Sequence, residues 1–246
     1  MVAIAGRLAA SGKISAVILQ RPMTTGGRLA RTLRRISRHG LARVADELLF
    51  RIYHRLYLRS GDDRLRRLLD LHAPATRAAL ASQVDVVSVD SINSSASQAL
   101  LTRLAPDLVV MVSRESIRPD VLKLARVGFI GCHPGILPDF RGAHASFWAR
   151  HEGRPDKIGL SIYLAAEGIG TGPLVAERVV APQFGVQHFI VESERLILEG
   201  TRELIEVIEQ AEQGALKTYT KPDPPGPLYG RVGLSDYLRV VRRPRT

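Results

Sequence analysis

"GFIGCHPGILPDFRGAHASFW", residues 128–148, is the stretch that decides the fold of this chain. Its apolar beginning leads directly into His133 and Pro134. A short apolar run that stops at turn-forming residues predicts a buried strand, with His133 at its carboxyl end. Ligands of open α/β sheets bind beyond the carboxyl ends of the strands, so His133 is the first candidate catalytic residue.

The sequence before His133 alternates between strand and helix patterns. The apolar runs are 84–90, 106–113 and 127–133, and the helical patterns between them are 94–105 and 118–126. Short strand–helix–strand units of this kind predict an α/β protein. We therefore expect a mostly parallel, twisted sheet with helices on both faces.

Elements outside this core follow from the same patterns. A helix is predicted over 2–11, a buried strand over 14–21 and a long amphipathic helix over 191–214. Two further strands, 157–167 and 173–180, flank a glycine-rich loop. Because glycines permit a tight turn, these two strands should pair in the antiparallel sense.

Residues 28–71 are rich in arginine, and their apolar positions recur every three or four residues. This spacing predicts amphipathic helices, broken near Gly40 and Gly61, within a helical insertion covering about 28–80. Two interpretations stay open: the arginine stems cover apolar surface, or the helices form a docking face for an acidic partner. The α/β domain should occupy 1–214. The Pro-rich, basic extension, 215–246, predicts an extended wrap and a loose end.

The composition of the chain restricts the classes of ligand and partner that we expect. The formal net charge is +11, which favours anionic ligands or reflects only an arginine-rich surface. Aromatic residues make up 5% of the chain, too few for a stacking platform, so a nucleic-acid partner is not expected. Cys132 is the only cysteine and no run is long enough to span a membrane, so we expect a cytoplasmic protein without membrane partners. A homo-oligomer remains open.

Residues 84–214 resemble the folate-dependent formyltransferase family. The similarity lies in "PDLVVMVS", "GFIGCHPGILPDFRGAHASFWA" and "IGLSIYLAAEGIGTGPLVAE". This family includes glycinamide ribonucleotide, methionyl-tRNA and sugar N-formyltransferases. The resemblance implies a Rossmann-like formyltransferase fold. It also implies N10-formyltetrahydrofolate as donor, a primary amine as acceptor, and no metal.

The resemblance also assigns roles to single residues. His133 matches the family histidine, which hydrogen-bonds the developing oxyanion. Gly131 stands where the family has asparagine, and Gly170 stands where it has aspartate. Three readings follow: an active formyltransferase, an impaired homologue (a pseudoenzyme) that binds folate or a partner, or altered one-carbon chemistry. In the active reading, the possible helpers of His133 are Asp139, His144 and Glu167.

The expected folate site lies on the loops at the strand ends. Its residues are Ser113, Arg114, Ser116, Ile117, Gly131, Cys132, Ala165, Ala166, Glu167, Gly168 and Gly170. Cys132 should point to the face opposite His133, and Arg141 should bind backbone carbonyls or a carboxylate. A small, anionic amine is the expected acceptor, because we see no separate tRNA-binding domain after residue 214.

Family members open with a short strand and a glycine-containing loop before the helix that is predicted here at 2–11. A sheet without that strand would leave part of a neighbouring ladder unpaired. We expect a longer natural product, or an edge covered by residues 28–71 or by a second subunit.

Overall fold

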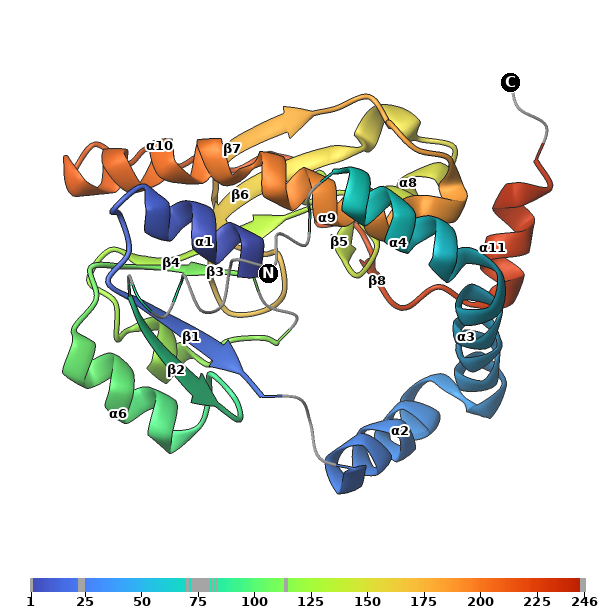
Figure 1. Ribbon diagram of the computed structural model, residues 1–246, viewed down its shortest axis with the longest axis horizontal. Helices are drawn as coiled ribbons and strands as arrows, with labels where there is room; N and C mark the ends of the chain where they lie inside the picture. The colour runs from blue at the N-terminus through green and yellow to red at the C-terminus, as the bar shows by residue number, and fades with distance from the viewer. Residues whose placement is uncertain are drawn as a thin grey trace.

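The computed structural model describes residues 2–21, 25–69, 71, 80, 82, 84–112 and 115–243 (Figure 1). Its main sheet contains β3 (Leu108–Met111), β4 (Gly128–His133), β6 (Gly159–Leu164) and β7 (Leu174–Val179), in that order. A second sheet pairs β1 (Ala16–Gln20) with β2 (Asp85–Val89) in parallel.

The α/β fold class is confirmed, but the main sheet is mixed. β3 and β4 are parallel, whereas β4–β6 and β6–β7 are antiparallel. The loop between β6 and β7 is too short for the crossover that a parallel pair requires, so these two strands form the predicted hairpin.

Helices cover both faces of β4. On one face, Ile130 and Cys132 pack with α1 (Val2–Ala10) and α10 (Thr201–Glu212). On the other face, Phe129 packs with α6 (Ser95–Leu104) and α7 (Pro119–Leu122). His133 lies on this second face because side chains alternate along a strand.

The sheet edges at β1 and β3 each pair on one side only within the described residues. Helix α1 connects the two sheets: Ile4 and Leu8 join the core of β4 and β6, and Ala9 packs with Val17 of β1. Residues 25–69 pack mainly elsewhere, on α9 (Phe189–Glu199) and α11 (Leu234–Val241). Among the described residues of 28–71, the expected cover of the strand edge is not seen.

The arginine-rich segment forms α2 (Thr25–His39), α3 (Leu41–Tyr53), a π-helical turn (His54–Leu58) and α4 (Arg59–Leu68). Gly40 breaks the helices as predicted, with φ of 81°. The predicted break at Gly61 is wrong, because Gly61 lies inside α4. A Cβ at Gly61 would lie 2.9 Å from the His188 ring, so glycine there allows close packing on the core.

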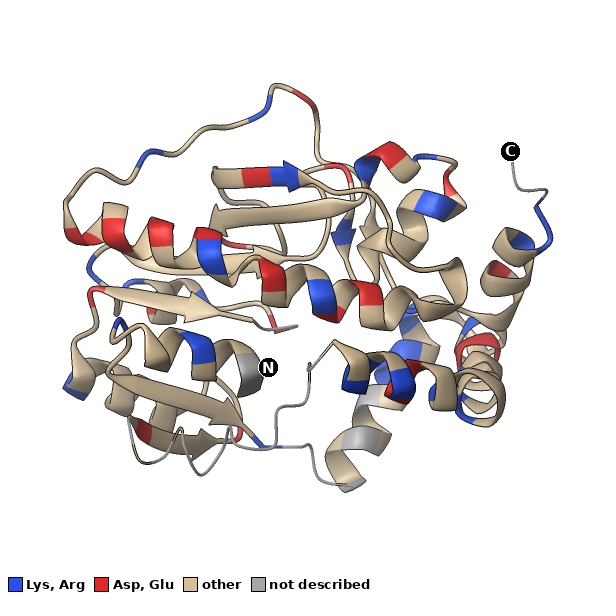
Figure 2. Cartoon of the chain, turned by 45° about the horizontal axis from the view of Figure 1, so that its top comes forward, with Lys and Arg blue, Asp and Glu red and all other residues tan. Residues whose placement is uncertain are grey.

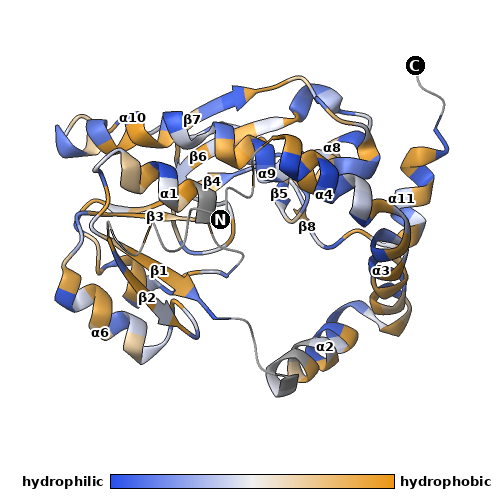
Figure 3. Ribbon diagram, viewed as in Figure 1, coloured by the Kyte–Doolittle hydropathy of each residue, from blue (hydrophilic) through white to orange (hydrophobic). Residues whose placement is uncertain are grey.

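Helices α2 and α3 stand away from the sheets (Figure 1), and α2 carries basic but no acidic residues (Figure 2). Large apolar side chains remain exposed here, including Leu29 and Leu33 on α2. Figure 3 shows hydrophobic positions in orange along α2 and α3. Arginine stems therefore do not fully cover the apolar surface.

The long helix predicted over 191–214 is wrong in one respect, because it is two helices. They meet at Gly200, where the side chain of Leu160 approaches so closely that a Cβ would collide with it. The C-terminal extension wraps as predicted: β8 (Leu228–Tyr229) pairs with β5 (Arg141–Gly142). Part of the expected loose end is ordered, because α11 (Leu234–Val241) buries Tyr237 in the core, and residues 244–246 lie outside the described residues.

The remaining elements are α8 (Ala145–His151) and two 3₁₀ turns, Pro155–Lys157 and Val186–His188. Among the described helices, none combines the length and hydropathy needed to cross a bilayer.

Candidate active site

The loop that follows His133 fixes the orientation of its ring and the tautomer that the ring adopts. Its Nε2 lies 2.8 Å from the backbone oxygen of Phe140. A carbonyl can only accept, so Nε2 carries the hydrogen and the neutral ring has its lone pair on Nδ1. Burial lowers the pKa of His133, and the hydrogen bond to Phe140 offsets this only in part. At neutral pH, Nδ1 is therefore ready to accept a proton.

The loop after His133 is fixed by groups from two other segments. Buried Ser161, opposite His133 on β6, donates to the Gly135 carbonyl (2.9 Å) and accepts from the Leu137 N–H (3.0 Å). Lys221 donates to the Leu137 carbonyl (2.8 Å) and to Glu177 (2.6 Å). The peptide bond between Leu137 and Pro138 is cis.

Arg141 connects the same loop to the C-terminal extension. Its Nε and Nη2 donate to the Gly226 carbonyl at 3.0 and 2.8 Å, as expected of an arginine that binds backbone. The Gly226 N–H in turn donates to the Pro138 carbonyl (2.9 Å). Within the described part of the chain, Arg141 has no carboxylate partner.

Tyr163 fills the space beside Gly131. The two residues are opposite each other in the β4–β6 register. A Cβ on Gly131 would collide with the Tyr163 ring and would lie 2.7 Å from its hydroxyl oxygen. Because Gly131 and His133 are two residues apart on one strand, Tyr163 lies over the same face as the imidazole.

Among the described residues, the atoms nearest to a Cβ built on Gly170 do not belong to a carboxylate. This buried residue has φ of 63°. A Cβ there would meet Leu137 Cδ2 at 3.0 Å and Arg141 Cγ at 3.5 Å. The nearest atoms thus belong to an apolar side chain and to a cation.

The three predicted helpers of His133 stay a prediction, and the structure gives the surroundings of each. Asp139 pairs with Lys157 at 2.7 Å. The ring of His144 packs edge-on against Phe189, with centroids 5.0 Å apart. Glu167 is exposed on the loop after β6.

The expected folate residues differ in burial, and two of them are not described. Ser113 and Arg114 lie outside the described residues. Ile117 is buried with Val121 and Phe129, and Cys132 is buried on the face opposite His133, so both have side chains committed to the core. Burial raises the pKa of the Cys132 thiol to about 12.

The other expected folate residues lie nearer the surface. Ala166 and Gly168 are exposed and Ala165 is partly buried at the end of β6, where its N–H donates to the Phe129 carbonyl (2.7 Å). Ser116 is exposed, and its carbonyl accepts from Asn93 (2.9 Å).

Sequence reasoning missed Ser161, Tyr163, Glu177 and Lys221. Alternation along "GLSIYL" places Ser161 and Tyr163 on one face, which is a usable signal. Pairing opposite Gly131 and His133 needs the antiparallel register, and the position of Lys221 depends on a distant wrap.

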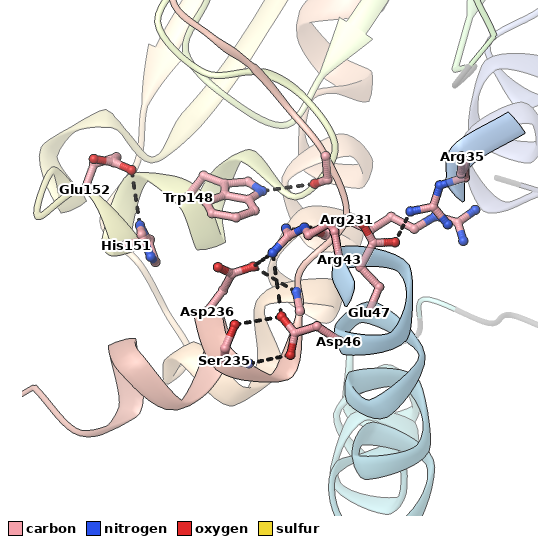
Figure 4. Close-up of polar contacts among 12 residues, drawn as sticks. Arg35, Arg43, Asp46, Glu47, Trp148, His151, Glu152, Arg231, Ser235 and Asp236 are labelled. Atoms are coloured by element: carbon pink, nitrogen blue, oxygen red, sulfur yellow. Dashed lines mark hydrogen bonds and ion pairs between the residues drawn. The ribbon is translucent and has the colours of Figure 1, made fainter. Parts of the chain in front are cut away.

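A second polar cluster joins the helical segment to the extension (Figure 4). Arg43 donates to Asp236 (2.6 Å), and Asp46 accepts from the hydroxyl of Ser235 (2.7 Å). A cavity of about 200 Å³ lies beside it. The cavity is lined by Glu47, Phe50, Arg51, His54, His144, Ile190, Arg231 and Val232.

The sequence around His133 also matches a known family. Residues 62–182 match the family described as "Formyl transferase". This match contains β2 to β7 and the whole His133 loop, so this part of the chain is similar to the formyl transferases.

Two curated relatives agree with this assignment. A methionyl-tRNA formyltransferase of Aromatoleum aromaticum is 28% identical over 169 residues, covering 67% of this chain and 52% of the relative. One from Bordetella bronchiseptica is 30% identical over 161 residues, covering 61% and 51%. The chain thus spans about half the length of the curated relatives it matches.

A solved structure has the same fold. Glycinamide ribonucleotide transformylase 1 of Symbiobacterium toebii aligns with 87% of this chain and 82% of its own, with a TM-score of 0.51 and 20% identity.

Proposed function

We propose that this chain transfers a formyl group from N10-formyltetrahydrofolate to a primary amine, with His133 as the base. The observation that carries the proposal is the His133 ring in a formyl transferase domain. Its Nε2–H is held by the Phe140 carbonyl, which leaves a basic Nδ1 on the neutral ring.

The proposed reaction is an acyl transfer. The lone pair of the amine nitrogen attacks the formyl carbon, and the C=O π electrons move to oxygen. A proton leaves the amine nitrogen to His133. The oxyanion then collapses, the bond from carbon to N10 breaks and N10 takes up a proton, giving a formamide and tetrahydrofolate.

A small, anionic amine is the acceptor that we favour. Arg141 lies on the loop next to His133 and has only a backbone carbonyl as its described acceptor. Its positive charge favours a phosphate or carboxylate on the acceptor. A nucleotide-linked amino sugar fits this chemistry.

Binding without turnover is the second candidate function. It is favoured by the surroundings of Gly170, where Leu137 and Arg141 stand in place of any acid. An imidazole without a carboxylate neighbour is a weaker base for removing the amine proton.

The test measures folate binding and turnover separately. The folded chain is titrated with a folate analogue by calorimetry, then incubated with N10-formyltetrahydrofolate and a panel of anionic primary amines. Tetrahydrofolate release with one amine supports transfer, and His133→Ala should abolish it. His151→Ala is the matched control, because His151 packs on Trp148 and not in the site. Binding without turnover by any amine selects the second candidate, and absence of binding overturns both.

A further inference from the structure

We propose that Tyr163 is a catalytic residue whose phenol donates a hydrogen bond to the formyl oxygen as negative charge develops on it. The inference rests on the proposed formyl transfer. Attack on a formyl carbon creates an oxyanion, and acyl-transfer sites hold such an oxyanion with fixed hydrogen-bond donors.

His133 does not supply that donor in its neutral form. Its single N–H, on Nε2, is used by the Phe140 carbonyl, and the lowered pKa keeps Nδ1 unprotonated. Nδ1 can receive the amine proton but cannot also donate to the oxyanion at the moment of attack.

The other polar groups near His133 are also committed. The Ser161 hydroxyl donates to the Gly135 carbonyl. Lys221 donates to the Leu137 carbonyl and to Glu177. These bonds hold the loop, so using them for the substrate would release it.

Tyr163 differs from these groups. Among the described residues, its hydroxyl has no hydrogen-bond partner. The side chain is partly buried, and burial raises the pKa of the phenol, so it stays an O–H donor at physiological pH. An oriented phenol with its hydrogen free is what the oxyanion requires.

The position of the hydroxyl also fits. It lies 2.7 Å from the place of a Cβ on Gly131, so the ring crosses from β6 onto β4. Gly131 and His133 are two residues apart on the same face, which corresponds to ~7 Å along a strand. A formyl group between them can direct its oxygen to Tyr163 and its carbon toward an amine beside His133.

Gly131 has a role in this arrangement. Any side chain there would push the phenol away, because even a Cβ collides with the ring. The absence of a side chain on Gly131 therefore leaves the space that the Tyr163 ring occupies. The proposed donor, Tyr163, is part of β6, and its ring extends across to β4.

The main test is Tyr163→Phe, which removes one oxygen and keeps the ring over Gly131. We expect kcat and kcat/KM to fall together by ~100-fold or more, since the lost bond forms only in the transition state. Affinity for a folate analogue should stay within ~3-fold. Tyr219→Phe is the matched control, because Tyr219 is bonded to Leu174 through its backbone and should keep wild-type turnover.

A second pair of variants tests the same role if the Tyr163→Phe protein does not fold. Tyr163→Ala opens the space, and adding Gly131→Asn places an amide donor there; the double variant should regain at least ~10-fold over Tyr163→Ala. Turnover of Tyr163→Phe within ~3-fold of wild type, at unchanged folate affinity, overturns the role of Tyr163 and leaves formyl transfer standing. A wild-type chain that transfers no formyl group overturns both.

Discussion

Asp62 is the residue whose removal should most loosen the arginine-rich helices from the α/β body. It lies on α4 with no exposed surface. Its carboxylate accepts from His54 Nε2 at 2.8 Å and from His188 Nδ1 at 2.7 Å. His188 precedes α9, so one buried carboxylate joins the helical segment to the body of the protein.

The size of the effect follows from the two lost bonds. Asp62→Ala leaves two imidazole N–H groups without an acceptor, at roughly 1–3 kcal/mol for each unsatisfied donor. The side chains of His54 and His188 are 18% and 20% exposed, so water partly replaces the carboxylate. The lower part of that range applies, and we expect a loss of ~2–4 kcal/mol in the free energy of unfolding.

Asp63→Ala is the control, because this neighbour on the same helix has a 40% exposed side chain and pairs with Arg66 at 2.9 Å. Because Asp63 is partly exposed and Arg66 keeps its pairing with Glu194 (2.7 Å), the loss should be less than about 1 kcal/mol. Urea unfolding followed by circular dichroism measures both variants, and limited trypsin digestion reports on the arginines of α2 to α4. If Asp62→Ala and Asp63→Ala unfold within ~0.5 kcal/mol of each other, the buried carboxylate does not have the role assigned to it.

Two further predictions concern titrating groups. Cys132 is buried and its pKa is raised to about 12, so its thiol should react with a disulfide reagent far more slowly in the native protein than in urea; equal rates would show that the thiol is accessible. If the proposed transfer is active, the acid-side fall of its rate should lie below the ordinary histidine pKa of about 6.5, because burial lowers the pKa of His133. The rate should also hold above the ordinary tyrosine pKa of about 10, because the raised pKa keeps Tyr163 protonated. A profile of kcat against pH that already falls between pH 7 and 8 on its acid side would contradict the state assigned to His133.

The sequence by itself determined the class of fold and the position of His133. A buried strand that stops at "HPGILP" places an imidazole at the end of a sheet, since both the apolar run and the turn residues are local signals. The hairpin of β6 and β7 was also predictable, because its short glycine-rich loop leaves no length for a crossover.

The tertiary structure decided what surrounds that histidine. Asp139 and His144 are close to His133 in sequence, yet they bind Lys157 and pack on Phe189. Tyr163, distant in sequence, reaches the same sheet face through the β4–β6 register. Likewise, Gly61 is helical and Gly200 is a break, because neighbouring side chains approach their backbones. Registers and close approaches depend on contacts between distant segments, and local propensity does not contain them.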